Sequence, residues 1–144
     1  MIMATKILYS TTAEATGGRD GKSGTTDGAF SVTLATPKEL GGNGEGNNPE
    51  QLFASGYAAC FLGALKYAAS QDKALPRVPA DTKVAATVGI GPRSDKGFGL
   101  AAELVITLPG VERSAAEALV AEADTICPYS HATRGNIEVK ISVA

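Results

Sequence analysis

The chain has 144 residues, of which 44% are hydrophobic and 19% charged, and its formal net charge at pH 7 is −2. This length suits one domain with a buried core, so we expect a single domain over residues 1–144. Charges of both signs are scattered along the chain, which predicts no binding to nucleic acid and no attraction to an anionic membrane.

The location of the protein is inferred from segments near the N-terminus and from the apolar runs. The N-terminal residues lack an apolar stretch followed by a small-residue cleavage site. The longest apolar run, residues 52–65, is interrupted by Ser55 and is shorter than the roughly 18 residues of a membrane helix. We therefore expect a cytoplasmic protein that does not cross a membrane.

The first third of the chain predicts short strands joined by loops. Residues 6–11 are β-branched and aromatic, which favours a strand, and Gly17-Gly18 ends it. Residues 30–35 alternate apolar side chains with smaller or polar ones after an Asp27-Gly28 turn signal, which predicts a half-buried strand. Residues 38–48 are rich in glycine and asparagine and predict a loop.

A long apolar helix is predicted from Pro49 to about Ser70. Asn48 suits the N-cap, Pro49 the first helical position, and Gln51 completes a capping box. Because the segment is apolar nearly all round, we expect it to be buried on most sides. An exposed connection over residues 72–82 follows it.

The remainder of the chain predicts three strands and one helix. The strands are residues 83–92, 99–110 and 135–144, the last of which alternates apolar and polar side chains. This order of elements predicts an α+β fold with mostly antiparallel pairing: strands, a helix, strands, a helix and a final strand.

The second helix is expected to begin at a capping box of Ser114 and Glu117 and to end near Ile126. Pro128 disfavours helical geometry at Cys127 and so ends the helix there. The apolar side chains recur at helical spacing and form one stripe, at Leu119, Ala123 and Ile126.

Two common kinds of site are not supported by the motifs. Residues 41–48 lack the third glycine of a dinucleotide fingerprint and the lysine of a P-loop, so a flexible turn is the better interpretation. Cys127 and His131 are separated by Pro128, and the chain has only one histidine and no Cys-x-x-Cys motif. We therefore predict no metal site and expect His131 in a loop.

The two cysteines, Cys60 and Cys127, are the remaining candidates for chemistry. Free cysteines often pack as small hydrophobes, and inert packing is the plain interpretation of both. A structural disulfide is not expected in a reducing compartment, but both thiols should point inward from separate elements, which suits a pair that can meet.

A reactive Cys60 would need help from a cation. It lies about three helical turns beyond Pro49, roughly 16 Å along the axis, where the field of the helix N-terminus has faded. Four basic residues are candidates for lowering its pKa: Arg19, Lys22, Lys66 and Arg134. Lys66, six residues further on, points to a different face of the helix, and composition and spacing alone do not choose among the other three.

Three segments carry a family resemblance. GGRDGK at residues 17–22, NPEQLFASGYAACFLGAL at 48–65 and CPYSHATRGNIEV at 127–139 resemble the organic hydroperoxide resistance (Ohr) branch of the OsmC/Ohr family. The resemblance covers nearly the whole chain, in the same order. It implies antiparallel sheets around a buried central helix and an intertwined homodimer.

The same resemblance implies a role for four residues. Cys60 corresponds to the peroxidatic cysteine, Cys127 to the resolving cysteine, Arg19 to the activating arginine and Glu50 to the carboxylate that orients it. The implied activity reduces alkyl or fatty-acid hydroperoxides through a sulfenic acid and an intramolecular disulfide. No bound cofactor is implied; the expected reductant is an external dithiol, a lipoyl group on a partner protein.

Helix geometry adds an expectation about assembly. Glu50 and Cys60 face broadly the same way but lie about 15 Å apart along the helix. An arginine that pairs with the carboxylate and contacts the thiol therefore needs Glu50 from a second, antiparallel copy, which predicts a homodimer with composite sites. Near Cys60, Phe53, Tyr57 and Phe61 are candidates to line an apolar substrate pocket, with core packing as the alternative.

Two rival functions stay open. One is a non-enzymatic module that binds or senses a ligand in its apolar cavity and has two inert thiols. The other is a peroxidase of the OsmC branch, with similar chemistry but a different substrate and reductant. An acidic Cys60 thiol favours either enzyme, whereas two ordinary thiols favour the module.

Overall fold

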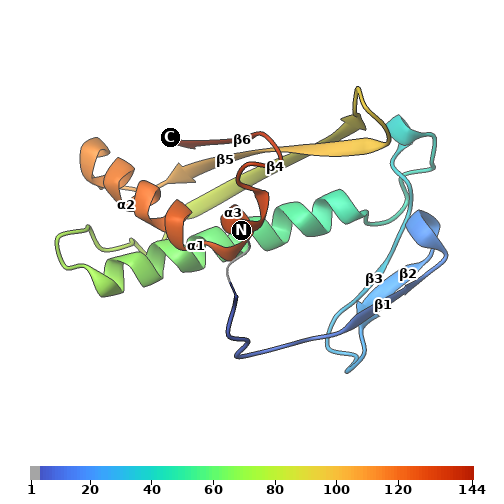
Figure 1. Cartoon of the computed structure of the whole chain (residues 1–144), viewed down its shortest axis with the longest axis horizontal. Helices are drawn as coiled ribbons and strands as arrows, with labels where there is room; N and C mark the ends of the chain where they lie inside the picture. The colour runs from blue at the N-terminus through green and yellow to red at the C-terminus, as the bar shows by residue number, and fades with distance from the viewer. Residues whose placement is uncertain (1–3) are drawn as a thin grey trace. The chain divides into compact units, whose positions relative to one another are not determined.

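The computed structural model describes residues 4–144 and divides into two compact units, Met1–Pro49 and Glu50–Ala144. The N-terminal unit holds a small antiparallel sheet of β1 (Ala13–Thr16), β2 (Lys22–Thr25) and β3 (Ser31–Thr33), in that order. Two 3₁₀ turns, η1 (Gly18–Asp20) and η2 (Lys38–Leu40), complete it. Figure 1 shows the three strands of this sheet side by side.

The N-terminal sheet differs in part from the prediction. The prediction of a strand at residues 6–11 is wrong, because the first strand begins at Ala13. Ile7, Leu8 and Tyr9 are instead 67%, 88% and 80% exposed. Apolar and β-branched side chains favour a strand only where a neighbouring strand pairs with them. The strand expected at residues 30–35 is confirmed as the shorter β3.

The turn before β3 and the loop after it agree with the sequence. The backbone N–H of Ala29 donates to the Asp27 carboxylate at 2.9 Å, and Gly28 takes a φ of 79°. This Asx turn confirms the Asp-Gly signal. β2 was not predicted, because its sequence KSGT has no apolar alternation.

The C-terminal unit packs its helices against a three-stranded sheet. α1 (Pro49–Gln71) and α2 (Arg113–Ile126) lie against β4 (Lys83–Pro92), β5 (Phe98–Thr107) and β6 (Val139–Val143), as Figure 1 shows. β4 and β5 pair antiparallel over ten residues each, whereas β5 and β6 pair parallel. A short helix, α3 (Pro128–Thr133), follows α2.

The core of this unit lies between α1, α2 and the sheet. It is built from fully buried residues of α1, β5 and α2 and from Cys127, which follows α2; the chief ones are Tyr57, Phe61, Leu65, Leu104, Ile106, Leu119, Ala123 and Cys127. The apolar stripe predicted for α2 therefore faces the core. Burial of this kind contributes roughly 1.5–3 kcal/mol per large side chain.

The predicted helices are confirmed, with one correction at a cap. α1 and α2 end within a residue of the expected positions, and α2 stops before Pro128. The N-cap of α2 is Glu112, not Ser114: the Glu112 carboxylate accepts the Ala115 N–H at 2.8 Å and the Ser114 hydroxyl at 2.7 Å. The Glu112 side chain folds back and accepts hydrogen bonds at the start of the helix, which is the capping role expected of Ser114.

α1 is buried on one side only within the chain, not on most sides as expected. Its inner face holds Tyr57, Phe61 and Leu65, while Ala59 and Tyr67 lie exposed. With 23 residues and a mean hydropathy of 1.2 over its most apolar window, it is long and apolar enough to cross a membrane, contrary to the sequence expectation. This is weak evidence for a span, because the core helix of a water-soluble protein meets the same criterion.

Candidate active site

The two thiols meet inside the C-terminal unit. The Sγ atoms of Cys60, on α1, and Cys127, at the end of α2, lie 3.5 Å apart. Cys127 is fully buried and Cys60 is half-buried, and both are free thiols. The expectation that the thiols point inward and meet is confirmed.

Cys127 lies at a bend that its own sequence produces. The residue has φ −62° and ψ 121°, the extended geometry that a following proline favours. Its N–H donates to the Ala123 carbonyl at 2.8 Å, and its carbonyl accepts the His131 N–H at 3.0 Å. Cys127 therefore ends α2 and begins α3, and the bend turns its side chain toward α1.

The two sulfurs are in van der Waals contact and are not bonded. A disulfide has a sulfur–sulfur length of about 2.05 Å, so the sulfurs need to approach by only about 1.5 Å to join. A pair already held at contact has a high effective concentration for that reaction. The geometry suits reversible formation of a disulfide between Cys60 and Cys127.

The surroundings of Cys60 within its unit oppose its ionisation. Burial raises the pKa of the Cys60 thiol, and the neighbouring Cys127 thiol raises it further. The backbone N–H of Tyr129 lowers that pKa and only partly offsets the burial. A thiolate at neutral pH therefore needs a positive charge beyond these groups.

The four candidate cations have different surroundings. The Arg134 guanidinium donates to the Asp124 carbonyl at 2.7 Å and lies 3.4 Å from the Asp124 carboxylate. Lys66 is exposed on α1, where it lines a groove with Ser70 and Arg77. Arg19 and Lys22 belong to the N-terminal unit, and a pairing of either with Cys60 stays a prediction.

Arg19 is carried on a tightly shaped turn. Gly17 and Gly18 take positive φ angles of 77° and 61°, and a Cβ on Gly21 would lie 1.7 Å from the Thr16 carbonyl oxygen. The Asp20 carboxylate then accepts the Thr36 N–H at 3.0 Å and the Thr36 hydroxyl at 3.1 Å. The GGRDG segment therefore gives Arg19 a defined backbone position on η1.

Glu50 stands in the first turn of α1 and is half-buried. A carboxylate at that place is favoured by the positive end of the helix dipole. Its predicted role toward Arg19 stays a prediction.

An aromatic group flanks the cysteine on α1. The Tyr129 ring lies 5.8 Å from that of Tyr57 and 6.1 Å from that of Phe53, between centroids. It seats against α1 at Gly56, where an added Cβ would lie 2.9 Å from the Tyr129 hydroxyl oxygen. The glycine allows this close approach one helical turn before Cys60.

The predicted pocket residues fall into two environments. Tyr57 and Phe61 are fully buried in the core and present no surface to a ligand in this structure. Phe53 instead lines an apolar cavity of about 370 Å³. The cavity is also lined by Leu100, Tyr129, Ala132, Thr133, Asn136 and Ile137. Substrate contact by Phe53 stays a prediction.

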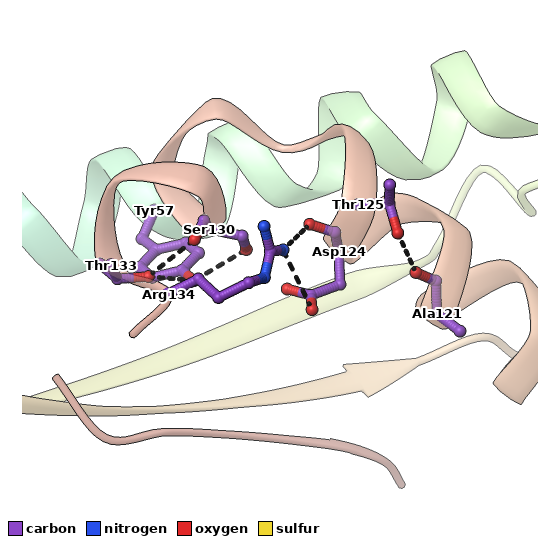
Figure 2. Close-up of polar contacts among 7 residues, drawn as sticks. All are labelled: Tyr57, Ala121, Asp124, Thr125, Ser130, Thr133 and Arg134. Carbon is purple, nitrogen blue, oxygen red and sulfur yellow. Dashed lines mark hydrogen bonds and ion pairs between the residues drawn. The ribbon is translucent and has the colours of Figure 1, made fainter. Parts of the chain in front are cut away.

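A buried hydroxyl cluster was missed by the sequence interpretation. The Tyr57 hydroxyl lies 2.8 Å from the Ser130 Oγ and 3.3 Å from the Thr133 Oγ1, and Figure 2 shows the three side chains converging. The signal was present in the sequence: Ser130 and Thr133 are three apart, which places them on one face of a helix. The expectation of a loop at His131 hides this helical spacing.

His131 lies on α3 and not in a loop, so that expectation is wrong. Its side chain is exposed. Among residues 4–144, no group of three or more His, Cys, Asp or Glu side chains gathers in a way that could hold a metal ion.

Comparisons with known proteins agree with one another. Residues 42–142 match the family model described as OsmC-like protein. The organic hydroperoxide resistance protein of Xanthomonas axonopodis pv. citri is 49% identical over 140 residues, covering 96% of each chain. A crystal structure of an organic hydroperoxide resistance protein from Legionella pneumophila has a TM-score of 0.90 at 47% identity, covering 96% of this chain and 99% of that one. OhrB of Bacillus subtilis has a TM-score of 0.84 at 37% identity, covering 96% and 100%.

Proposed function

The chain belongs to the OsmC-like protein family, and we propose that it is a cysteine-based peroxidase that reduces organic hydroperoxides to alcohols. The observation that carries the proposal is the 3.5 Å contact between the Cys60 and Cys127 sulfurs. The names of relatives that match over nearly their whole length give the substrate class. A module with inert thiols would not need two sulfurs from separate elements in contact.

In the first step, the Cys60 thiolate attacks the outer oxygen of the hydroperoxide R-O-O-H. The oxygen–oxygen bond breaks, the alkoxide takes up a proton and leaves as the alcohol, and the sulfur is oxidised by two electrons to a sulfenic acid. Cys127 then attacks the Cys60 sulfur; a disulfide forms and the oxygen leaves as water. The short sulfur–sulfur distance supports this second step.

The first step requires the thiolate, which burial of Cys60 disfavours. We assign Arg19 to stabilise it and to position the peroxide. Glu50 orients the Arg19 guanidinium through a charge-assisted, bidentate pair. The defined turn that carries Arg19 supports a positioning role for this segment.

Preference for a bulky substrate rests on the apolar cavity lined by Phe53 and Tyr129. Each methylene of the substrate that is buried there contributes roughly 0.8 kcal/mol, which hydrogen peroxide cannot gain. Tyr129 links the cavity to the reaction centre, because its backbone N–H acts on the Cys60 thiol.

The working form is a homodimer with composite sites. α1 leaves an exposed face, and the apolar residues Ile7, Leu8 and Tyr9 are exposed in the single chain. A second copy would cover such surfaces in an intertwined arrangement. Glu50 of one copy then serves the Cys60 of its partner.

The disulfide returns to two thiols by exchange with an external dithiol, which is itself oxidised. A lipoyl group on a partner protein is the reductant that we expect. The protein acts in the cytoplasm and needs no bound cofactor, nucleic acid or membrane.

The proposal is tested by titrating the reduced protein with cumene hydroperoxide and, separately, with hydrogen peroxide while free thiols are counted. We expect one equivalent of cumene hydroperoxide to remove both thiols rapidly and hydrogen peroxide to act far more slowly. Equal, slow loss with both oxidants would contradict the proposal and favour the ligand-binding module. Equal, fast loss would favour the OsmC branch.

Single-cysteine variants separate the two thiols. Cys60→Ser should abolish reaction with the hydroperoxide, since the assigned nucleophile is gone and the remaining thiol, Cys127, is fully buried. Cys127→Ser should react once and then pass to the sulfinic acid with excess oxidant. Turnover by the Cys60→Ser variant would refute the assigned nucleophile.

A further inference from the structure

α3 is tied to α1 by a buried hydroxyl cluster. The Tyr57 hydroxyl, 2.8 Å from the Ser130 Oγ, is fully buried, and Ser130 is 2% exposed. The Thr133 hydroxyl donates to the Ser130 carbonyl at 3.2 Å and lies 3.3 Å from the Tyr57 oxygen. Water does not reach these groups, so loss of the Ser130 hydroxyl would leave the buried Tyr57 hydroxyl with only the longer contact to Thr133.

The same short helix is tied to α2 at its other end. Arg134, which ends α3, donates from Nη2 to the Asp124 carbonyl at 2.7 Å, and the Asp124 carboxylate lies 3.4 Å away. Figure 2 shows this pair beside the hydroxyl cluster. α3 is therefore fastened both to the helix that carries Cys60 and to the helix that ends at Cys127.

The residues that make these two sets of contacts lie close to the two cysteines along the chain. Tyr57 precedes Cys60 by three residues, so the two are neighbours on α1. Ser130 follows Cys127 by three residues, and Cys127 begins α3. A shift of α3 away from α1 would carry the Cys127 sulfur away from the Cys60 sulfur.

We propose that Tyr57 and Ser130 are positioning residues for the second chemical step, with the Arg134–Asp124 pair as a support. The inference rests on the proposed function. Their hydrogen bond holds Cys127 at contact distance, so that the Cys60 sulfenic acid meets the thiol before it meets a second hydroperoxide. Tyr57 thus acts through α3 and not on the substrate.

The products formed from the Cys60 sulfenic acid can be measured to test the proposal. The Cys60 sulfenic acid has two fates: attack by the Cys127 sulfur, which forms the disulfide and releases water, or attack on a second hydroperoxide, which forms a sulfinic acid and a second alcohol. The first fate uses the Cys127 sulfur as a reactant, whereas formation of the sulfenic acid does not. The division between disulfide and sulfinic acid therefore reports the position of Cys127.

Tyr57→Phe and Ser130→Ala remove the same hydrogen bond from its two ends. With cumene hydroperoxide, we expect both variants to form the sulfenic acid at a rate within about twofold of the original protein. Formation of the disulfide should slow by about three- to tenfold, as expected for one lost hydrogen bond. Mass spectrometry should then find sulfinic acid at Cys60 with an excess of oxidant at which the original protein shows none.

The matched control is Tyr67→Phe, which removes a hydroxyl from an exposed tyrosine of the same helix and should leave both rates unchanged. The double variant Tyr57→Phe/Ser130→Ala should be no slower than the slower single variant, because one bond is lost only once. If Tyr57→Phe does not fold, Ser130→Ala carries the test, since it removes one small hydroxyl.

Two results would overturn the inference: formation of the disulfide at the original rate in both variants, or an equal slowing of both steps. A failure of the original protein to react with the hydroperoxide would instead refute the proposed function. The first step of the original protein thus separates the two proposals.

Discussion

Cys60 is a thiol whose own unit keeps it protonated. Burial is the largest influence on its pKa and raises it, the Cys127 thiol adds to the rise, and the Tyr129 N–H opposes both. A raised pKa means that the reactive thiolate becomes common only at alkaline pH. A cation beside Cys60 would reverse this rise, and its presence decides whether the residue is a catalyst or a packed side chain.

Removal of Arg19 should therefore expose the effect of burial. In a Cys127→Ser background, where one thiol remains, we expect the pKa of Cys60 to lie below the ordinary value of about 8.5. Adding Arg19→Ala should raise it above that value, a change of about 1–3 pH units. Reactivity at pH 7 then falls, and the alkylation rate by iodoacetamide rises with pH at a higher midpoint.

Lys22→Ala is the matched control, because Lys22 is a second cation of the same segment. It should leave the alkylation midpoint near that of the parent protein. A midpoint that Arg19→Ala does not move would remove the arginine from the mechanism and leave the acidity of the thiol without a source.

Elements differ in how far their sequence determines them. α1, β4 and β5 follow from long runs of 10 or more residues that favour one kind of element, and the bend at Cys127 follows from Pro128. β2 and α3 were missed because they are short and owe their form to neighbours: β2 to its partner strands and α3 to the bonds that fasten it.

The candidate site was predictable to a similar extent. The meeting of Cys60 and Cys127 followed from the place of Cys60 in an apolar helix and from the position of Cys127 after the Leu119 and Ala123 stripe. The role of the Tyr57 hydroxyl could not be predicted, because an aromatic residue beside a reactive cysteine suggests contact with the substrate. Only the position of α3 in the structure shows that this hydroxyl bonds to Ser130. Such partners lie far apart in sequence and depend on the packed structure.

The cap of α2 gives a prediction at this scale. The Ala115 N–H and the Ser114 hydroxyl lower the pKa of the exposed Glu112 carboxyl. Because the folded pKa is depressed, the stabilisation is present above the unfolded value of about 4.3 and is lost as the pH falls through the folded value. Glu112→Ala should therefore lower the thermal unfolding midpoint clearly at pH 7 and much less below pH 3.

Glu122→Ala removes a carboxylate from an exposed position on the same helix, outside its first turn, and serves as the control. It should shift the midpoint less than Glu112→Ala at pH 7. Equal shifts for the two variants would mean that the cap contributes nothing beyond the removal of a charge.

At the scale of the whole molecule, the single chain leaves apolar surface uncovered. Leu8 and Tyr9 are at least 80% exposed, and Tyr67 on the outer face of α1 is 55% exposed. Exposed apolar surface of this kind marks an interaction site, and a second copy of the chain is the partner that we propose. A dimer would also resolve the membrane-like composition of α1 without a membrane.

The composite site is tested by mixing two inactive variants, Glu50→Ala and Cys60→Ser, and allowing the subunits to exchange. If the carboxylate of one copy serves the thiol of the other, each mixed dimer regains one intact site, built from Glu50 of the Cys60→Ser copy and Cys60 of the Glu50→Ala copy. Random exchange makes half of the dimers mixed, so hydroperoxide turnover should return to about a quarter of the original level. Sedimentation and a mass-labelled subunit establish that exchange has occurred. Complete exchange without recovery would assign both residues of a site to one chain, because a mixed dimer would then hold no intact site.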